Sequence, residues 1–188
     1  MKAIVILGSR NPGGQTARAA EGFIEGLAAA GGQAEKVMLP ALRIDRCRQC
    51  GDAGWGICRS EGRCVIADDD FASLVDRIRS ADAAVFASPV YWGDLSESIR
   101  AFLDRLRRVT RHDTGKAGIA GKPAMGICVA GGGGGGAPFC AFDLDKILAT
   151  IGFDVFDTVL ARRQNLEMKR RILAVTGEWV GSHGAPKG

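Results

Sequence analysis

The sequence predicts a single α/β domain in which a parallel β-sheet is covered by helices on both faces. Three observations lead to this prediction. Five apolar runs alternate with segments whose apolar residues recur at helical spacing, and such units form parallel sheets because right-handed crossovers place their helices on both faces. The chain of 188 residues has the length of one domain. It shows no internal repeat and no linker long enough to divide it.

The first strand and the first helix have the clearest patterns. Residues 3–7 read AIVIL, a continuous apolar run that indicates a strand buried on both faces. A glycine-rich loop follows, and then apolar residues at positions i, i+3, i+4 and i+7 predict a helix: Ala20, Phe23, Ile24 and Leu27. Gly31 and Gly32 are expected to end this helix. Residues 34–39, AEKVML, form the second expected strand.

The same alternation continues through the middle of the chain. One helical face consists of Phe71, Leu74, Val75 and Ile78, and the aspartates at 68–70 are available to cap its N-terminus. Residues 83–88, AAVFAS, form a third buried strand. The next helical face consists of Ile99, Phe102, Leu103 and Leu106, and Asp94 with Glu97 has capping-box spacing ahead of it. Residues 124–130, AMGICVA, form the fourth strand.

The last elements complete the domain. A helical face consists of Leu144, Ile147, Leu148 and Ile151. Residues 153–160, FDVFDTVL, form the fifth strand, and a final helix is expected over about Asn165–Val180. A polar tail from about residue 181 is expected to be frayed. The domain is therefore expected to occupy residues 1–188, with a cysteine-rich insertion at about residues 45–66.

Composition and charge argue against several classes of protein. The chain is 46% hydrophobic and 24% charged, which is ordinary for a soluble globular protein. Its net charge of +4 is mild and its basic residues are dispersed, so no nucleic-acid partner is expected. No run approaches about 18 apolar residues, so no membrane span is expected. The opening apolar run is too short for an export signal, so the expected compartment is a reducing cytoplasm.

Three loops of unusual composition follow the first, third and fourth strands. In an open parallel sheet, ligands bind outside the C-terminal ends of the strands, where the strand order reverses. The first loop, residues 8–16, reads GSRNPGGQT. Its glycines let backbone N–H groups turn inward, Ser9 and Thr16 add hydroxyls, and the helix that follows adds a partial positive charge. These features predict a phosphate-binding nest.

The first loop matches neither of two common nucleotide-binding motifs. It lacks the dinucleotide pattern G-x-G-x-x-G and the Walker pattern G-x-x-x-x-G-K-[ST], including the lysine that a nucleoside triphosphate site needs. A tight turn without a ligand is the alternative interpretation, because glycine loops are permissive.

The second loop, residues 88–96, reads SPVYWGDLS. Pro89 stiffens the turn and Gly93 permits close approach of the backbone. Tyr91 and Trp92 lie between them and offer flat apolar surfaces at the end of a strand. Two adjacent aromatic residues in this position predict the wall of a site for a planar ligand.

The third loop, residues 130–139, contains six consecutive glycines. Such a run loses much conformational entropy on folding. A floppy connector is one interpretation. Its position at the same sheet edge as the other two loops favours another, in which the main chain lies against a ligand. Together the three loops suit a phosphorylated planar cofactor.

The chain resembles the NADPH-dependent FMN reductase group of flavodoxin-like flavoproteins, and most of all the branch that includes the iron–sulfur flavoproteins. The resemblance is carried, in order, by GSRNPGGQT, a cysteine segment ending in GRCVIADDDF, SPVYWGDLSESIRAFLDRL and the glycine run. It covers about residues 1–155. It implies a flavodoxin-like three-layer α/β/α sandwich whose five-stranded parallel sheet has the order 2-1-3-4-5, with FMN as the cofactor.

The resemblance assigns FMN contacts to all three loops. The first loop would hold the phosphate, the second would lie along the isoalloxazine and the ribityl chain, and the third would approach the pyrimidine end. The implied FMN-binding residues are Ser9, Arg10, Gly14, Gln15, Thr16, Pro89, Val90, Tyr91, Trp92, Gly93, Gly131, Gly132, Gly133 and Gly134.

The implied reaction is hydride uptake from NAD(P)H by the flavin and delivery to a small electron acceptor such as a quinone, free flavin or oxygen. Because the flavin carries the redox step, no catalytic acid–base side chain is expected, and His112 and His183 are expected at the surface. A homodimer or homotetramer is expected, because flavoproteins of this group commonly build the FMN site at a dimer interface. Two other functions stay open: an electron carrier that acts between protein partners, and a non-redox sensor that binds zinc.

Four of the six cysteines are spaced C-x2-C-x7-C-x5-C: Cys47, Cys50, Cys58 and Cys64. Four thiolates in one loop can hold a [4Fe–4S] cluster or a tetrahedral zinc ion. The iron–sulfur flavoproteins have two residues between the second and third cysteines, whereas this chain has seven. A cluster, a zinc ion and metal-free thiols that pack or respond to oxidation therefore all stay open. Trp55 in this insertion is expected to pack on a second subunit, and Cys128 and Cys140 are expected to be core residues.

Overall fold

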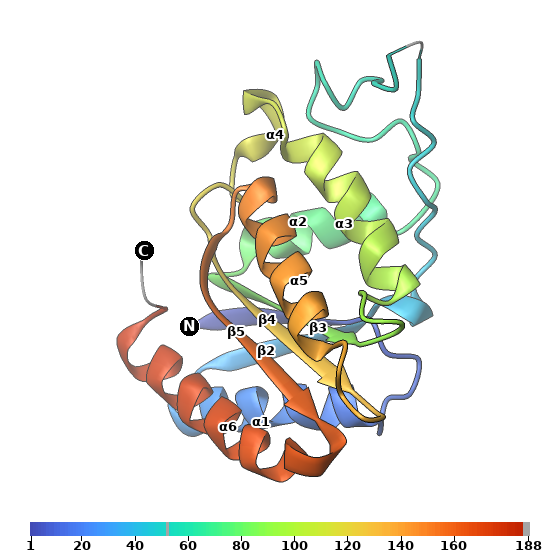
Figure 1. Cartoon of the computed structure of the whole chain (residues 1–188). Coiled ribbons are helices and arrows are strands. Elements are labelled where there is room, and N and C mark those ends of the chain that lie inside the picture. The colour runs from blue at the N-terminus through green and yellow to red at the C-terminus, as the bar shows by residue number, and fades with distance from the viewer. Residues whose placement is uncertain (52, 186–188) are drawn as a thin grey trace.

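The computed structural model describes residues 1–51 and 53–185 and contains a five-stranded sheet. The strand order is β2-β1-β3-β4-β5, and all four neighbouring pairs are parallel. This confirms the predicted sheet and its order (Figure 1). The strands are β1 (Lys2–Leu7), β2 (Gln33–Met38), β3 (Ala83–Pro89), β4 (Pro123–Ala130) and β5 (Asp154–Arg162).

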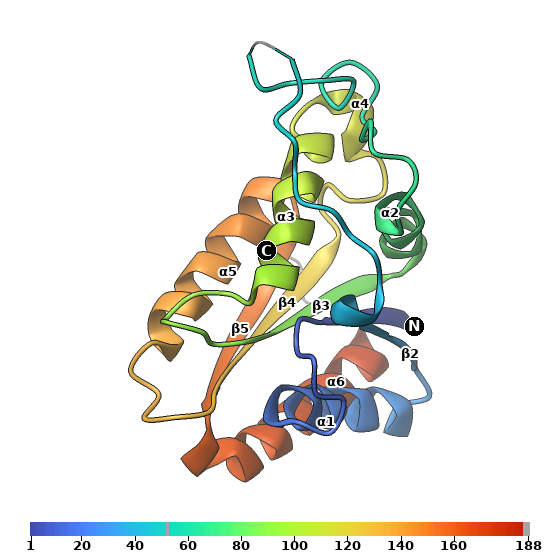
Figure 2. The same ribbon diagram turned by 90° about the vertical axis from the view of Figure 1, so that its right-hand side faces the viewer.

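Helices cover both faces of this sheet, as predicted. Figures 1 and 2 show α1 and α6 together on one face, with α2, α3 and α5 on the other. The helices are α1 (Gln15–Ala29), α2 (Phe71–Ser80), α3 (Glu97–Thr110), α4 (Asp113–Lys116), α5 (Ala137–Ile151) and α6 (Leu166–His183), and the 3-10 turns are η1 (Leu39–Ala41) and η2 (Arg163–Asn165). None of these helices combines the length and the apolar character needed to cross a membrane.

Two apolar cores fill the spaces between the three layers. The core beneath α1 and α6 includes Phe23 and Met125, and the core beneath α2, α3 and α5 includes Phe86 and Phe102. All four side chains are fully buried, and burying a side chain of this size stabilises a fold by about 1.5–3 kcal/mol. Strands β1, β3 and β4 are buried on both faces, which explains their continuous apolar runs.

Glycines set the contact between α1 and α6. A Cβ atom on Gly26 would lie 1.8 Å from the carbonyl oxygen of Ala174, and a Cβ on Gly177 would lie 2.1 Å from that of Phe23. Any larger residue would collide with backbone at either position. Direct backbone contact therefore fixes the orientation of α6 on the domain.

The predicted caps differ in their outcome. At α2, the aspartates do receive the first helical N–H, because Asp69 Oδ1 accepts a hydrogen bond from Phe71 N at 3.2 Å. The capping box before α3 is wrong. The N-cap of α3 is Ser96, and Asp94 instead accepts a hydrogen bond from Leu95 N at 2.6 Å.

The C-terminal helix is longer than predicted. It continues to His183, because Val180 remains buried against the core and holds the last turn in place. Of the expected tail, residues 186–188 lie outside the described residues.

The cysteine segment connects η1 to α2 and packs against α3 and α4. Residues 42–51 and 53–70 contain neither helix nor strand. Arg108 of α3 donates a hydrogen bond to the carbonyl oxygen of Gly54. A Cβ on Gly62 would lie 2.5 Å from Gly115 Cα. These contacts help to hold the segment against the domain.

Candidate functional site

The three loops meet at the C-terminal edge of the sheet, around the point where the strand order reverses between β1 and β3. Gly8 directly follows β1, and its N–H donates to the carbonyl oxygen of Ala87 at 2.9 Å. A Cβ on Gly8 would lie 2.3 Å from Ser96 Oγ, and Ser98 Oγ donates to the Gly8 carbonyl at 3.1 Å. Only glycine fits between the first loop and the start of α3.

The first loop is shaped by its own side chains. Asn11 N donates to Ser9 Oγ at 3.2 Å, and Gly13 N donates to Asn11 Oδ1 at 3.0 Å. Gly14 is the N-cap of α1 and has no side chain to cap the helix. These bonds turn the loop so that it enters α1 with a bare helix N-terminus.

The N-terminus of α1 presents polar groups without partners. Its first turn contains no acidic residue, and the N–H groups of residues 15–17 have no backbone acceptor among the described residues. Gln15 Oε1 is buried and lacks a hydrogen-bond partner, and Thr16 is 3% exposed. Free N–H groups together with the helix dipole attract an anion, so this end of the helix suits a phosphate.

Arg10 adds a charge at the rim of this loop. It forms an ion pair with Glu97, in the first turn of α3, and both side chains are largely exposed. Two open cavities adjoin it. One of about 370 Å³ is lined by Ser9, Arg10 and the residues after β2, and one of about 630 Å³ extends along α3. An exposed ion pair contributes little stability, so Arg10 is free to exchange Glu97 for another anion.

The second loop contains a tight reverse turn. Tyr91 N donates to Asp94 O at 3.0 Å, and Asp94 N donates to Tyr91 O at 2.9 Å. The two residues between them have positive φ angles, 56° at Trp92 and 83° at Gly93, which is the geometry of a type I′ turn. Positive φ is strained for tryptophan, yet the Trp92 side chain is fully exposed and packs on nothing. Backbone strain of this kind is concentrated at ligand sites.

A buried serine closes the base of the second loop. Ser88 is 0% exposed. Its Oγ accepts a hydrogen bond from Ser96 N at 3.0 Å and donates one to Pro89 O at 2.9 Å. Val90 N donates to the carbonyl oxygen of Val129 at 3.0 Å, so the loop leaves the sheet beside β4.

The third loop touches the second through backbone. A Cβ on Gly136 would lie 2.5 Å from Gly93 Cα and 2.9 Å from Gly93 N. Gly134 has φ +82°, and a Cβ there would meet the side chain of Arg162 at 2.4 Å. By contrast, Gly131, Gly132, Gly133 and Gly135 face open space. Two of the six glycines are therefore required by packing, while the others leave the backbone accessible.

The four cysteines of the insertion gather around one small cavity. Cys47, Cys50, Cys58 and Cys64 all line it together with Arg105 and Arg108. Its volume is about 20 Å³, room for about one water molecule. No group of three or more His, Cys, Asp or Glu side chains is arranged to hold a metal ion in residues 1–51 and 53–185. The thiols suit a metal chemically, but a cluster would require this cavity to open.

An ion pair that the sequence analysis did not identify holds the cysteine segment to α3. The side chains of Asp69 and Arg105 are each 1% exposed and bonded to one another. Arg105 also donates to the carbonyl oxygens of Asp45, at 3.1 Å, and Ile66, at 3.3 Å. A clue was available in the sequence. Arg105 lies three residues after Phe102, on the apolar face of its helix, where a charged side chain must find a buried partner.

The surroundings of this ion pair keep both groups charged. Burial raises the pKa of Asp69, but hydrogen bonds from Arg105 and from the backbone N–H groups of Asp45 and Phe71 outweigh it, so the pKa lies below its ordinary value. Burial lowers the pKa of Arg105, but hydrogen bonds with Asp69 and Cys64 outweigh that effect and raise it. Arg105 therefore connects the cysteine cavity to the core.

Trp55 packs on its own domain, and its expected contact with a second subunit stays a prediction. Its ring lies 4.5 Å from the Arg108 guanidinium carbon and makes an edge contact with His112, at 5.3 Å between centroids. Both histidines were expected at the surface. His183 is exposed, as predicted, whereas His112 is half-buried. Trp55 thus helps to hold the insertion against α3.

The two remaining cysteines are core residues, as predicted. Cys128 and Cys140 are both 0% exposed, and their Sγ atoms lie 3.4 Å apart. The hydrogen bond with Cys140, together with burial, raises the pKa of the Cys128 thiol well above its ordinary value.

The structure places the sequence-predicted residues of all three loops at one edge of the sheet. Residues 9–16 surround the helix N-terminus and residues 89–93 form the strained turn. Gly131, Gly132 and Gly133 form an accessible strip of backbone beside that turn, whereas Gly134 is buried against Arg162. Their contacts with FMN stay a prediction. The network of Ser88, Ser96 and Ser98 that joins the first two loops was not identified from the sequence.

Comparison with known proteins adds family relatives to this geometry. Residues 1–165 match a family described as NADPH-dependent FMN reductase. An iron–sulfur flavoprotein of Archaeoglobus fulgidus is 32% identical over 106 residues, which is 56% of this chain and 46% of that protein. The chain spans about half the length of the curated relatives that it matches.

Solved structures show the same fold at low identity. An NAD(P)H:quinone oxidoreductase from Methanothermobacter marburgensis has a TM-score of 0.65 and 19% identity, with 97% of this chain and 94% of that chain covered. A flavodoxin from the domain Archaea has a TM-score of 0.59 and 15% identity, with coverage of 97% and 100%. The fold is therefore flavodoxin-like, as predicted.

Proposed function

Because the chain belongs to the NADPH-dependent FMN reductase family, we propose that it binds FMN at the C-terminal edge of its sheet. There it transfers reducing equivalents from NAD(P)H to a small electron acceptor, such as a quinone, free flavin or oxygen. The wall and base of the site are the three loops after β1, β3 and β4.

The observation that carries this proposal is the bare N-terminus of α1. Gly14 supplies no side chain to occupy the first N–H groups of this helix, and its first turn has no acidic residue to repel an anion. A phosphate would accept hydrogen bonds from the N–H groups and be attracted by the helix dipole. The Gln15 side chain would contact the phosphate through its NH2 group, because its Oε1 atom can only accept hydrogen bonds.

Each loop has a separate task in this proposal. Ser9, Gly14 and Thr16 hold the phosphate, with Gln15 beside them. Arg10 leaves Glu97 and pairs with the phosphate dianion, which carries the greater charge. The resulting charge-assisted hydrogen bonds are the strong ones in such a site.

The second and third loops orient the ring. Pro89 and Val90 lie where the chain leaves the sheet, and the turn at Tyr91, Trp92 and Gly93 presents aromatic surface to a planar ligand. The exposed backbone of Gly131, Gly132 and Gly133, with the buried Gly134 next to it, supplies N–H and C=O groups for the pyrimidine end of the ring. FMN, when bound, supplies the chemistry itself, because its ring accepts a hydride and passes the electrons on. We assign no catalytic acid–base side chain.

Steady-state turnover tests this proposal. The purified protein, with FMN added and without any partner protein, is expected to oxidise NADPH or NADH when a quinone such as menadione is supplied. Protein that binds FMN but shows no turnover above free FMN with either nucleotide would contradict the reductase function and leave the cofactor assignment standing.

A second candidate function is an FMN electron carrier that also holds a [4Fe–4S] cluster and acts between protein partners. It is supported by the four cysteines, which all line one cavity, and by relatives that are named iron–sulfur flavoproteins. The cavity of about 20 Å³ opposes it. Anaerobic purification followed by iron and acid-labile sulfide analysis distinguishes the two functions: about four irons per chain support the carrier, and zinc in place of iron would support the sensor.

The remaining expectations belong to the same proposal. They are a homodimer or homotetramer, a cytoplasmic location, and the lack of a nucleic-acid or membrane partner. The mild net charge of +4 supports only the last of these. Sedimentation with and without FMN would reveal whether the cofactor and the assembly depend on one another.

A further inference from the structure

Helix α6 has apolar side chains on two opposite faces. One face is buried against the domain through Leu166, Leu173 and Val180. The other points to solvent and exposes Met168 by 53%, Ile172 by 42%, Val175 by 66% and Trp179 by 47%. A helix that is apolar on both sides is normally covered on both sides. Large exposed apolar residues that form a continuous row mark an interaction surface.

The four exposed residues, which we call the α6 stripe, have the spacing of a helix–helix seam. They follow one another by four, three and four residues, which is the alternation of the a and d positions in a coiled coil. At 3.6 residues per turn they form one straight row along the helix, roughly opposite its buried residues. A second helix is therefore the shape that fits the stripe.

The helix that carries the stripe is held rigidly. Gly177 and Gly181 of α6 and Gly22 and Gly26 of α1 let the two backbones touch, and no larger residue could be accommodated at Gly26 or Gly177. Arg170 adds an ion pair with Glu25 at 3.3 Å. A rigid helix loses little conformational entropy when a partner packs on it.

The charges beside the stripe select the partner. Arg171 and Glu178 lie seven residues apart on one flank, both are exposed, and neither has an ion-pair partner among the described residues. If a second α6 lies antiparallel about a two-fold axis between Ile172 and Val175, Arg171 faces the partner's Glu178. The two-fold axis generates a second, identical ion pair between the partner's Arg171 and Glu178 of the first copy. A parallel arrangement would place Arg171 opposite Thr176 and lose both pairs.

We propose that the α6 stripe is a self-association surface, on which α6 of a second copy of this chain packs antiparallel. Met168 would meet the partner's Trp179, and Ile172 would meet the partner's Val175. Such a contact is isologous, since each copy presents the same patch. A seam of one helix per copy is smaller than the roughly 800 Å² per partner of a standard interface, so the dimer is concentration-dependent.

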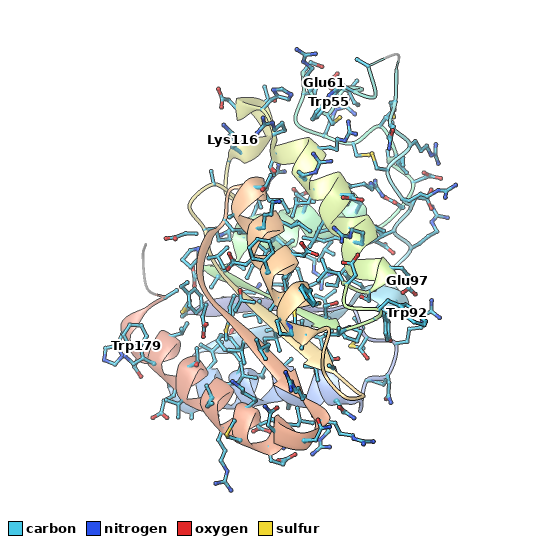
Figure 3. All side chains as sticks on the ribbon, viewed as in Figure 1. Trp55, Glu61, Trp92, Glu97, Lys116 and Trp179 are labelled. Atoms are coloured by element: carbon cyan, nitrogen blue, oxygen red, sulfur yellow. The ribbon has the colours of Figure 1, made fainter. Side chains whose placement is uncertain are left out.

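The stripe is separate from the proposed FMN site. Figure 3 shows Trp179 on the opposite side of the molecule from Trp92 and Glu97, which lie at the loop edge. The inference therefore does not rest on the proposed function, and substitutions in the stripe are expected to leave FMN binding unchanged.

Sedimentation equilibrium over a range of concentrations tests the proposal, with FMN in the buffer. The unaltered chain is expected to double its mass as its concentration rises, from monomer to dimer, or from dimer to tetramer if the loop edge also pairs. Val175→Glu buries a carboxylate at the centre of the seam and is expected to abolish this doubling at every concentration. Val65→Glu is the matched control, because Val65 is also an exposed valine, 52% accessible, but lies in the cysteine segment. It is expected to dimerise like the unaltered chain. Circular dichroism and FMN binding show that both variants are folded.

A charge exchange tests the antiparallel arrangement. Arg171→Glu alone and Glu178→Arg alone place like charges opposite one another, and each is expected to weaken self-association by about tenfold. An equimolar mixture of these two variants restores both ion pairs, so it is expected to form a mixed dimer more tightly than either variant forms its own. The double variant is also expected to recover.

Three results would overturn the proposal. The mass of the unaltered chain could stay the same at every concentration, which would exclude self-association through the stripe. Val175→Glu could dimerise as well as the unaltered chain, which would place the interface on another face. The mixture of charge variants could fail to form a mixed dimer, which would exclude the antiparallel seam.

Discussion

The contact between Gly136 and Gly93 provides a sharp test of whether the second and third loops form one site. Gly136 has φ −83° and ψ −9°, which alanine adopts without strain, so Gly136→Ala changes only the space that the residue fills. Its new Cβ would lie 2.5 Å from Gly93 Cα. Because an ordinary contact is about 3.5 Å, the two loops must move apart by about 1 Å.

The expected effect can be estimated from this displacement. Forcing an extra methyl group into a filled space costs typically about 1–3 kcal/mol. If FMN binds between the loops, the misplaced turn at Trp92 weakens its contacts as well, and we expect FMN affinity to fall by about tenfold or more. Gly135→Ala is the matched control, since a Cβ there meets nothing within 4 Å. It is expected to bind FMN like the unaltered chain.

Quenching of flavin fluorescence measures FMN affinity, and urea unfolding of the apoprotein measures the strain separately. If Gly136→Ala and the unaltered chain bind FMN equally well, the second and third loops do not form one FMN site. If Gly135→Ala loses as much affinity as Gly136→Ala, the effect comes from the glycine run itself and the steric reasoning is wrong.

Three further predictions concern stability, thiol reactivity and strain. Asp69→Asn is expected to lower the free energy of unfolding by about 3–5 kcal/mol at pH 7, because it leaves Arg105 buried without its partner. Since the pKa of Asp69 is lowered in the folded state, its contribution is complete above the unfolded value of about 3.9 and is lost as pH falls through the folded value. Urea unfolding at pH 7 and pH 3 should therefore show a smaller difference between Asp69→Asn and the unaltered chain at pH 3, and an equal difference would contradict this. Native, metal-free protein is expected to react with a thiol reagent at the four half-exposed cysteines but not at the buried Cys128 and Cys140, and labelling of all six before unfolding would show that the core opens. Trp92→Asn is expected to leave stability unchanged or raise it by up to about 1 kcal/mol, since asparagine tolerates positive φ, while FMN affinity falls; unchanged affinity would remove Trp92 from the site.

The sheet could be predicted from the sequence because its signal is local. Runs such as AIVIL and AMGICVA are long enough to indicate buried strands by themselves, and their alternation with helical patterns fixes a parallel sheet. The loops at its C-terminal edge followed from the topology. The capping box predicted from the spacing of Asp94 and Glu97 was wrong, because this spacing matched the motif by coincidence. In the structure, Asp94 accepts a hydrogen bond within the turn before α3.

Other features depend on contacts between residues that are distant in the sequence. Asp69 and Arg105 are separated by 36 positions, and no local pattern pairs them. The spacing of the cysteines allowed several metal sites, and only the packing of their segment against α3 revealed how little space lies between them. The sequence alone does not show which apolar residues of α6 are exposed, because the buried side of this helix is set by its glycine contacts with α1.

A titration of the apoprotein with FMN and, in parallel, with riboflavin would decide whether the bare N-terminus of α1 is a phosphate site. The two ligands share the ring and the ribityl chain and differ only in the phosphate. About one FMN per chain is expected, with riboflavin binding at least about tenfold weaker, because charge-assisted hydrogen bonds contribute about 1.5–3 kcal/mol each. Equal affinity for the two ligands would contradict the phosphate site, and no binding of either would contradict the flavin site as a whole.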